Sequence, residues 1–103
     1  MQDSLKGHVD LLLLSVLGEE PTHGYGLVEA LRTRSEGAFD LAEGTVYPAL
    51  YRLERHGLVE SSWVDGRTRR RRVYRLTRKG AAALRRERTA WDRYVNAMRA
   101  VLA

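Results

Sequence analysis

Large aliphatic residues repeat at helical spacing in four stretches of the chain, and between the last two stretches the repeat changes to every second residue. The first helical stretch ends near residue 17, just before a glycine, and Asp3 or Ser4 is expected to cap its start. The second is predicted over residues 23–35, with Thr22 as its cap. The fold class is therefore expected to be mainly α.

The first helix has an apolar face too broad for a surface helix. A face of this width is typical of a helix that is buried on more than one side. Farther along, Gly24 and Gly26 flank Tyr25, which predicts a close approach of another helix or of a phosphate to the backbone there. Phe39 and Leu41 are expected to pack into the core and so to anchor the short extended link between the second and third helices. The broad face consists of Val9, Leu11, Leu12, Leu13, Leu14, Val16 and Leu17.

The stretch of residues 41–59 contains the third helical repeat, which has an apolar side and a polar side and ends before Gly57. Val46, Leu50 and Leu53 form one narrow stripe, and Gly57 then suits a left-handed C-terminal cap. Such a helix can lie in the DNA major groove while its back packs on a small core, although an ordinary surface helix has the same pattern. The opposite side carries Thr45, Pro48, Tyr51, Arg52 and Arg55.

Period-two alternation follows and predicts a small β-hairpin. Residues 58–64 and 71–76 are expected as strands, with Asp65-Gly66 as a turn signal between them. Thr77 is then expected to cap a last helix that runs to the C-terminus. The second and third helices, separated by a short link, loosely match a helix-turn-helix pattern.

The hairpin carries the densest charge in a chain whose net charge is +5. Residues 67–79 include eight of the 18 basic residues and no acid. With nothing local to offset them, these charges repel one another, which favours a polyanionic partner such as nucleic acid. A solvated face that serves only solubility is the alternative.

The last helix carries a heptad seam with one polar interruption, Arg88. The simplest cover for so long an apolar stripe is the same helix of a second copy. Folding back on the first helix is the alternative, and one helix can do both. A dimer would pair two recognition helices for half-site reading. The seam runs through Ala81, Leu84, Arg88, Trp91, Val95, Met98 and Leu102.

Composition excludes several classes of function. The chain has no cysteine, and His8, His23 and His56 lie in separate segments without metal-ligand spacing. No nucleophile elbow or phosphate loop is present, so an enzyme, a metal site and a cofactor are not expected. The longest aliphatic run, residues 11–14, is far too short to span a membrane, and the start lacks the features of a signal peptide. A cytoplasmic protein with no membrane partner is expected.

These segments together resemble the PadR family of transcriptional regulators, over nearly the whole chain and in its short type. The most specific motif is Gly-Thr-Val-Tyr-Pro-Ala-Leu at residues 44–50, followed by Arg-Leu-Glu at 52–54. One departure is Ala42, where many relatives have a capping serine, which leaves the start of that helix open. The other matching segments are Lys6-Gly7, residues 11–17, residues 23–27, residues 57–59, residues 72–77 and Gly80.

The resemblance implies a winged helix-turn-helix domain over residues 1–76 and a C-terminal dimerisation helix over residues 77–103. It implies a homodimeric repressor on near-palindromic operator DNA, with residues 45–56 in the major groove and the hairpin tip, residues 65–70, as the wing. Such regulators often release DNA on binding a small aromatic or drug-like effector. Trp91 stands where some members line that cavity, although it could simply anchor the interface.

The expected sites follow from the pattern and the resemblance together. The rival function is nonspecific architectural binding of DNA or RNA by the basic hairpin. Pro48 is expected either to touch a thymine methyl or only to restrain the helix start. The expected DNA contacts are Thr45, Tyr47, Pro48, Tyr51, Arg52, Arg55, Arg67, Arg69, Arg70 and Arg71, and the expected dimer contacts are Leu84, Trp91, Val95, Met98 and Leu102.

Overall fold

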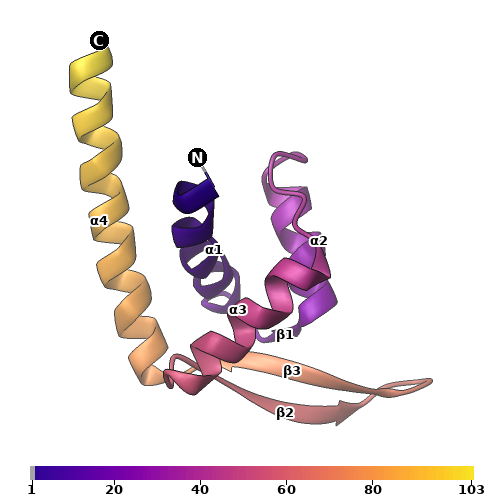
Figure 1. Cartoon of the computed structure of the whole chain (residues 1–103). Coiled ribbons are helices and arrows are strands. Elements are labelled where there is room, and N and C mark those ends of the chain that lie inside the picture. Colours follow the sequence, from indigo (N-terminus) through magenta and orange to yellow (C-terminus); the bar gives the residue numbers. More distant parts are fainter. Residues whose placement is uncertain (1) are drawn as a thin grey trace.

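The computed structural model describes the backbone of residues 2–103 and the side chains of residues 8–103. Helices gather above a small sheet, the hairpin reaches out to one side, and the last helix stands as a long rod at the other (Figure 1). This arrangement is a winged helix-turn-helix with a long C-terminal helix, as predicted. The elements are α1 (Gln2–Leu17), β1 (Thr22–His23), α2 (Gly24–Arg34), α3 (Glu43–Arg55), β2 (Val59–Asp65), β3 (Arg70–Leu76) and α4 (Arg78–Leu102).

The sheet has three antiparallel strands in the order β1-β3-β2. In the hairpin, Val59 pairs with Leu76 and Asp65 with Arg70, so residues 66–69 form the connecting loop. We call β2, β3 and this loop the wing. The prediction of a two-stranded sheet was incomplete, because β1 is only two residues long and shows no period in sequence. It forms by pairing with the middle of β3.

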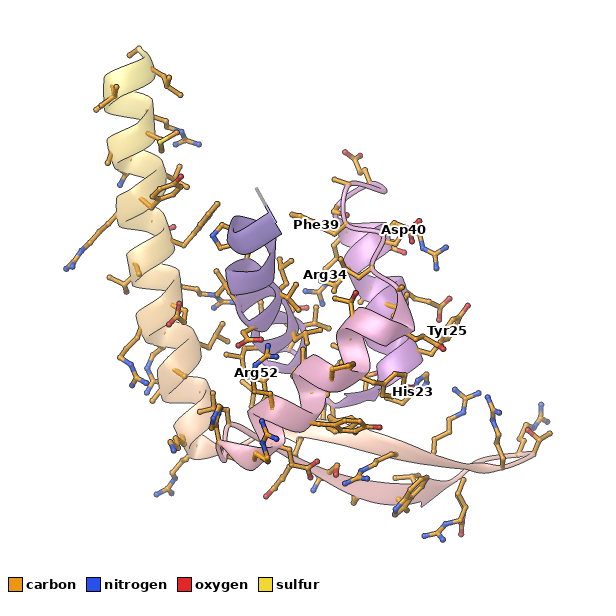
Figure 2. All side chains as sticks on the ribbon, viewed as in Figure 1. His23, Tyr25, Arg34, Phe39, Asp40 and Arg52 are labelled. Carbon is orange, nitrogen blue, oxygen red and sulfur yellow. The ribbon has the colours of Figure 1, made fainter. Side chains whose placement is uncertain are left out.

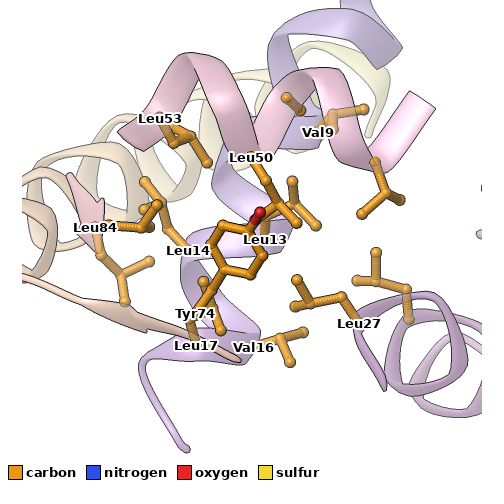
Figure 3. Packing of buried hydrophobic residues seen from close by; sticks show 14 of the residues in the cluster. Val9, Leu13, Leu14, Val16, Leu17, Leu27, Leu50, Leu53, Tyr74 and Leu84 are labelled. Carbon is orange, nitrogen blue, oxygen red and sulfur yellow. The ribbon is translucent and has the colours of Figure 1, made fainter. Parts of the chain in front are cut away.

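A single apolar cluster joins α1, α2, α3, β2, β3 and the start of α4. Its centre is the fully buried ring of Tyr74, which is surrounded by Leu13 and Leu14 of α1 and Leu50 of α3 (Figure 3). The predicted inner stripe of α3 is confirmed, since Val46 and Leu53 are also buried. On α1, five of the seven predicted apolar residues are buried and Leu11 and Leu12 pack against the cluster, so α1 is covered on several sides: Val9, Leu13, Leu14, Val16 and Leu17 are the buried ones.

Helix ends agree with the predictions at three positions. The amide of Gly18 donates to the carbonyl of Leu14 at 2.8 Å where α1 ends. Gly57 adopts a left-handed φ of +75° after α3, and the Thr77 hydroxyl accepts from the Gly80 amide at 3.0 Å. The chain therefore uses the stop and start signals that the sequence presents.

Three other helix starts differ from expectation or were left open. α1 begins at Gln2, ahead of the expected caps Asp3 and Ser4, whose side chains lie outside the described residues. The prediction of Thr22 as cap of α2 was wrong, because Thr22 pairs in β1 and the ring of His23 takes the cap position. α3 starts at Glu43, and Ala42 offers no side-chain cap.

Two glycines allow elements to approach closely. A Cβ atom on Gly24 would lie 2.5 Å from Cζ of Tyr47, so the start of α2 packs directly against that ring, and the close approach of another helix that the sequence predicted is confirmed for Gly24. A Cβ atom on Gly80 would lie 1.9 Å from the carbonyl oxygen of Leu58. The start of α4 is therefore pressed against the base of the wing.

The link between α2 and α3 is anchored by its apolar side chains, as predicted. Phe39 and Leu41 pack against the core cluster. The Ser35 hydroxyl accepts from the Phe39 amide at 2.8 Å and donates to the carbonyl of Leu31 at 2.7 Å. This link fixes where α3 begins relative to α2.

α4 has two different halves. Its first turns pack on α1, and Ala83 and Leu84 are buried in the core. The expected dimer seam therefore needs a correction at Leu84, which this chain covers itself. Arg88 and Trp91 still contact α1, through Ser15 and His8, and only beyond them does α4 extend past the rest of the molecule (Figure 1). Although α4 has 25 residues, none of the helices in the described part of the chain is long and apolar enough to cross a membrane.

Candidate nucleic-acid interface

The outer face of α3 is exposed, as the sequence pattern predicts. The burial of Val46 and Leu50 turns the opposite side of the helix to solvent. Tyr51 is 51% exposed and offers a flat ring with a hydroxyl at its edge. The exposed residues of this face are Thr45, Pro48, Tyr51 and Arg55.

Tyr47 and Arg52, the other two expected contacts on α3, are held by neighbours in this chain. The ring of Tyr47 packs over Gly24 and lies 6.3 Å from the ring of Tyr51, centroid to centroid. Arg52 forms an ion pair with Asp10 of α1, and its side chain is 36% exposed (Figure 2). Contact of Arg52 with DNA stays a prediction, and it would require this ion pair to open.

The loop of the wing closes with a hydrogen bond from the Gly66 amide to the carbonyl of Arg69 at 3.0 Å. The expected phosphate contacts of the wing are all exposed: Arg67, Arg69, Arg70 and Arg71.

The expectation that nothing local offsets the wing charges was wrong. Arg70 lies 3.7 Å from the carboxylate of Asp65, since the two residues are cross-strand partners. Arg72 lies 3.3 Å from Glu54 of α3 and also donates to the Ser61 hydroxyl at 2.8 Å. A third pair joins Arg75 and Glu60 across the strands.

These ion pairs leave part of the positive charge uncompensated. All three are solvent-accessible, and such pairs contribute little to stability. Arg67, Arg69 and Arg71 form no ion pair with any residue whose side chain the structure describes. The uncompensated positive charge of the wing is therefore concentrated in its loop and at Arg71, near the start of β3.

A groove of about 740 Å³ lies between α3, the first turn of α2 and the wing. It brings Tyr51 of α3 and the arginines of β3 to one surface. Aromatic rings and guanidinium groups line it, and Glu43 is its one carboxylate among the described residues. The lining residues are His23, Tyr25, Glu43, Tyr47, Tyr51, Trp63, Arg69, Arg70, Arg71, Arg72 and Tyr74.

Trp63 belongs to this groove and was not predicted to do so. Its side chain is 56% exposed, and the guanidinium carbons of Arg70 and Arg72 lie 5.4 and 5.9 Å from its ring. Stacking of this kind holds both arginines against the wing. The signal available in sequence was the alternation of β2, but the pairing of Trp63 with Arg72 depends on the strand register.

Two titratable groups in the groove have shifted pKa values. Burial raises the pKa of Tyr74, whose hydroxyl has no hydrogen-bond partner among the described residues. Burial and the neighbouring charge of Arg71 lower the pKa of His23. The imidazole of His23 is therefore neutral near pH 7, and its Nδ1 accepts from the Gly26 amide at 3.0 Å.

A second surface lies on the outer half of α4. Trp91 is 40% exposed, its ring meets His8 of α1 edge-on at 4.9 Å, and Tyr94 lies 5.8 Å from it. Val95 is half-buried. Tyr94 was missed because it falls beside the heptad positions. The exposed large apolar residues of this half are Trp91, Tyr94, Met98, Val101 and Leu102.

Comparison with known proteins agrees with this architecture. The profile of the transcriptional regulator PadR-like family matches residues 13–86. The chain is 39% identical over 94 residues to the transcriptional regulator Rv3488 of Mycobacterium tuberculosis, which covers 89% of this chain and 83% of that protein.

Solved structures give the same result. A transcriptional regulator from Clostridium thermocellum superposes with a TM-score of 0.87 at 28% identity and covers 96% of this chain and 94% of its own. A PadR family transcription regulator from Clostridium difficile superposes with a TM-score of 0.80 at 31% identity, covering 93% of this chain and 99% of its own.

Proposed function

The chain belongs to the PadR-like family of transcriptional regulators, and we propose that it acts as a homodimeric repressor on a near-palindromic operator. The observation that carries this proposal is the groove, where the outer face of α3 and the arginines of β3 share one surface. A helix that enters the major groove can therefore read bases while the adjacent wing holds the backbone.

The proposed division of labour follows from exposure and chemistry. Thr45, Tyr51 and Pro48 are exposed on α3 and would meet base edges or nearby sugars. Arg55 and the tip arginines of the wing would bind phosphates, since guanidinium groups form forked contacts with phosphate oxygens. If about six to eight phosphates are neutralised per dimer, the log–log salt slope of binding would be roughly −5 to −7.

The outer half of α4 supports the dimer. Its aromatic and aliphatic side chains are exposed on a helix that projects beyond the core (Figure 1). Exposed patches of this kind typically mark association surfaces. A second copy, joined in a two-fold arrangement, would cover them and would present two α3 helices to two half-sites.

The test is footprinting on the DNA next to the protein's own gene, in the presence of excess nonspecific duplex. A sequence-specific regulator protects a defined, near-palindromic segment and keeps it under competition. Loss of protection under competition would instead identify the rival function, an architectural protein that binds through charge alone. A salt dependence near zero would contradict both.

Release by a small aromatic effector is the second part of the proposal. Trp91 offers an exposed ring beside Tyr94 and His8, and such rings stack on planar ligands. An interface anchor is the alternative role for Trp91. The two roles predict different responses of Trp91 fluorescence to added ligand: a ligand site should show quenching, and an interface anchor should show none.

The chain has two tryptophans, so Trp63→Phe isolates the signal of Trp91 and Trp91→Phe serves as its matched control. Aromatic or drug-like compounds should quench the Trp63→Phe protein and leave the Trp91→Phe protein unchanged, with both still dimeric. If no compound of this class quenches either protein, Trp91 is an interface anchor only.

A further inference from the structure

His23 and Arg71 meet at the rim of the groove, where the first turn of α2 faces the wing. His23 pairs with Val73 in the β1–β3 ladder, and Arg71 is two residues from Val73 on the same face of β3. Nη1 of Arg71 therefore comes within 3.0 Å of Nε2 of His23. Figure 2 shows His23 at the lower end of α2, directly above the wing.

The contact on the other ring nitrogen fixes where the proton of His23 lies. Nδ1 accepts from the Gly26 amide at 3.0 Å, and a neutral imidazole that accepts at one nitrogen carries its hydrogen on the other. Nε2 of His23 is therefore a donor. A guanidinium group has donors only, so this 3.0 Å approach joins two donors with no acceptor between them.

The surroundings on the described surface supply no acceptor for this pair. Arg71 forms no ion pair with the side chains that the structure describes, and it is exposed. Glu29 of α2 acts on His23 only as a distant charge, and no hydrogen bond joins the two. One anionic oxygen that lies beside the pair, at hydrogen-bond distance from both Nε2 and Nη1, would accept from both.

We propose that His23 is a DNA-contacting residue, and that its Nε2–H and the guanidinium of Arg71 donate to the same phosphate oxygen of the DNA backbone. This inference rests on the proposed DNA-binding function. A phosphate suits the pair better than a base edge, because the pair offers donors only, whereas base edges mix donors and acceptors. The contact ties α2 to the wing and is independent of sequence.

Two substitutions of His23 distinguish the roles of its two ring nitrogens, the helix cap at Nδ1 and the donor at Nε2. Asparagine places an acceptor near Nδ1 and is a good helix cap, but it leaves the Nε2 position empty. Glutamine reaches the Nε2 position with an N–H donor and leaves the cap unfilled. We expect His23→Asn to fold like the wild type and to bind DNA roughly 10-fold more weakly per protomer, because one hydrogen bond to a charged group is lost. His23→Gln should be less stable yet bind DNA close to wild type.

Binding is measured at 10 °C by fluorescence anisotropy on two labelled 30-base-pair duplexes, one from the protein's own promoter and one of shuffled sequence, with far-UV circular dichroism to confirm folding. A phosphate contact weakens binding to both duplexes by the same factor. Arg71→Gln should also make the salt slope shallower by roughly 0.9 per protomer, whereas His23→Asn should leave the slope unchanged because neutral histidine releases no counterion.

A double-mutant cycle tests whether the phosphate is shared. His23→Asn should cost less than 2-fold in the Arg71→Gln background, because the shared oxygen is no longer held there. Arg75→Gln is the matched control. This substitution removes one positive charge from the same strand, but Arg75 lies outside the groove lining. In the Arg75→Gln background, His23→Asn should weaken DNA binding by the same factor as it does in the wild type.

Three results would overturn the inference: equal DNA binding by His23→Asn and wild type, equal losses for His23→Asn and His23→Gln, or equal costs of His23→Asn in the Arg71→Gln and Arg75→Gln backgrounds. Failure of the wild type to bind either duplex would overturn the proposed function instead.

Discussion

Adding one methyl group, by substitution with alanine, is expected to affect stability in opposite directions at two glycines of the helix-turn-helix. A Cβ atom on Gly24 would lie 2.5 Å from the ring of Tyr47, whereas a Cβ atom on Gly44 meets nothing within 4 Å. Both residues lie in the first turn of a helix, where alanine has the better intrinsic propensity. Packing therefore decides the sign of each substitution.

We expect Gly24→Ala to lower the free energy of unfolding by about 1–3 kcal/mol, because the Tyr47 ring must move and α3 with it. Gly44→Ala, the matched control, should leave stability unchanged or raise it by up to ~1 kcal/mol. Urea unfolding of the two variants checks this. Equal stabilities would mean that the approach of α2 to Tyr47 is looser than described.

The titration of His23 predicts how stability depends on pH. Its pKa is lowered by burial first and by Arg71 of β3 second, with Glu29 of α2 acting in the opposite direction, while the unfolded chain keeps the ordinary value of 6.5. Below that pH the unfolded state binds a proton that the folded state resists. Stability contributed by neutral His23 is therefore complete above the unfolded pKa and is lost as the pH falls towards the folded pKa.

We expect the free energy of unfolding to fall between pH 7.5 and pH 5.5, and to fall less in His23→Asn. His8 and His56 are present in both proteins, so the difference between the two pH profiles reports His23 alone. Urea unfolding at the two pH values gives the measurement. A wild-type profile that rises on acidification, or one parallel to that of the variant, would contradict the assignment.

At the level of elements, Thr77 joins the wing to α4. Its hydroxyl accepts from the Gly80 amide at 3.0 Å as the helix cap, and it also donates to the carbonyl of Gly57 at 2.6 Å. We expect Thr77→Ala to cost about 1 kcal/mol of stability or somewhat more, since both bonds are lost. Thr89→Ala, whose hydroxyl bonds only the carbonyl of Arg85 within α4, should change stability by less than about 0.5 kcal/mol.

The elements also show what the sequence could predict and why. The inner stripe of α3 and the cap at Thr77 were predictable, because a helical period and a cap are local patterns. β1 and the groove were not, because both depend on pairing between residues about 50 positions apart, such as His23 with Val73. The acidic partners of the wing arginines could not be predicted for the same reason. Glu54 becomes a partner of Arg72 only when α3 packs beside β2.

At the scale of the whole molecule, the outer half of α4 can be altered without touching the core. Val101 and Met98 are 84% and 43% exposed. A charge at either position should disrupt a two-copy assembly and leave the single chain folded, because neither residue belongs to the core cluster.

We expect Met98→Glu to shift the protein from dimer to monomer at micromolar concentration in sedimentation velocity, with an unchanged circular dichroism spectrum. Arg93→Glu, a charge change on an exposed residue outside the seam, is the control and should remain dimeric. A wild type that sediments as a monomer would contradict the proposed dimer directly.

The close contact between Gly80 and the carbonyl of Leu58 couples the orientation of α4 to the base of the hairpin, and this contact is the fulcrum about which α4 would tilt. The arm from Gly80 to Leu102 is roughly 33 Å long at 1.5 Å per residue, so a tilt of about 5° moves its tip by about 3 Å. Since backbone meets backbone at the fulcrum, such a tilt cannot occur there without carrying the root of the hairpin along. The angle at which two such arms cross would then set the distance between the two DNA-reading ends.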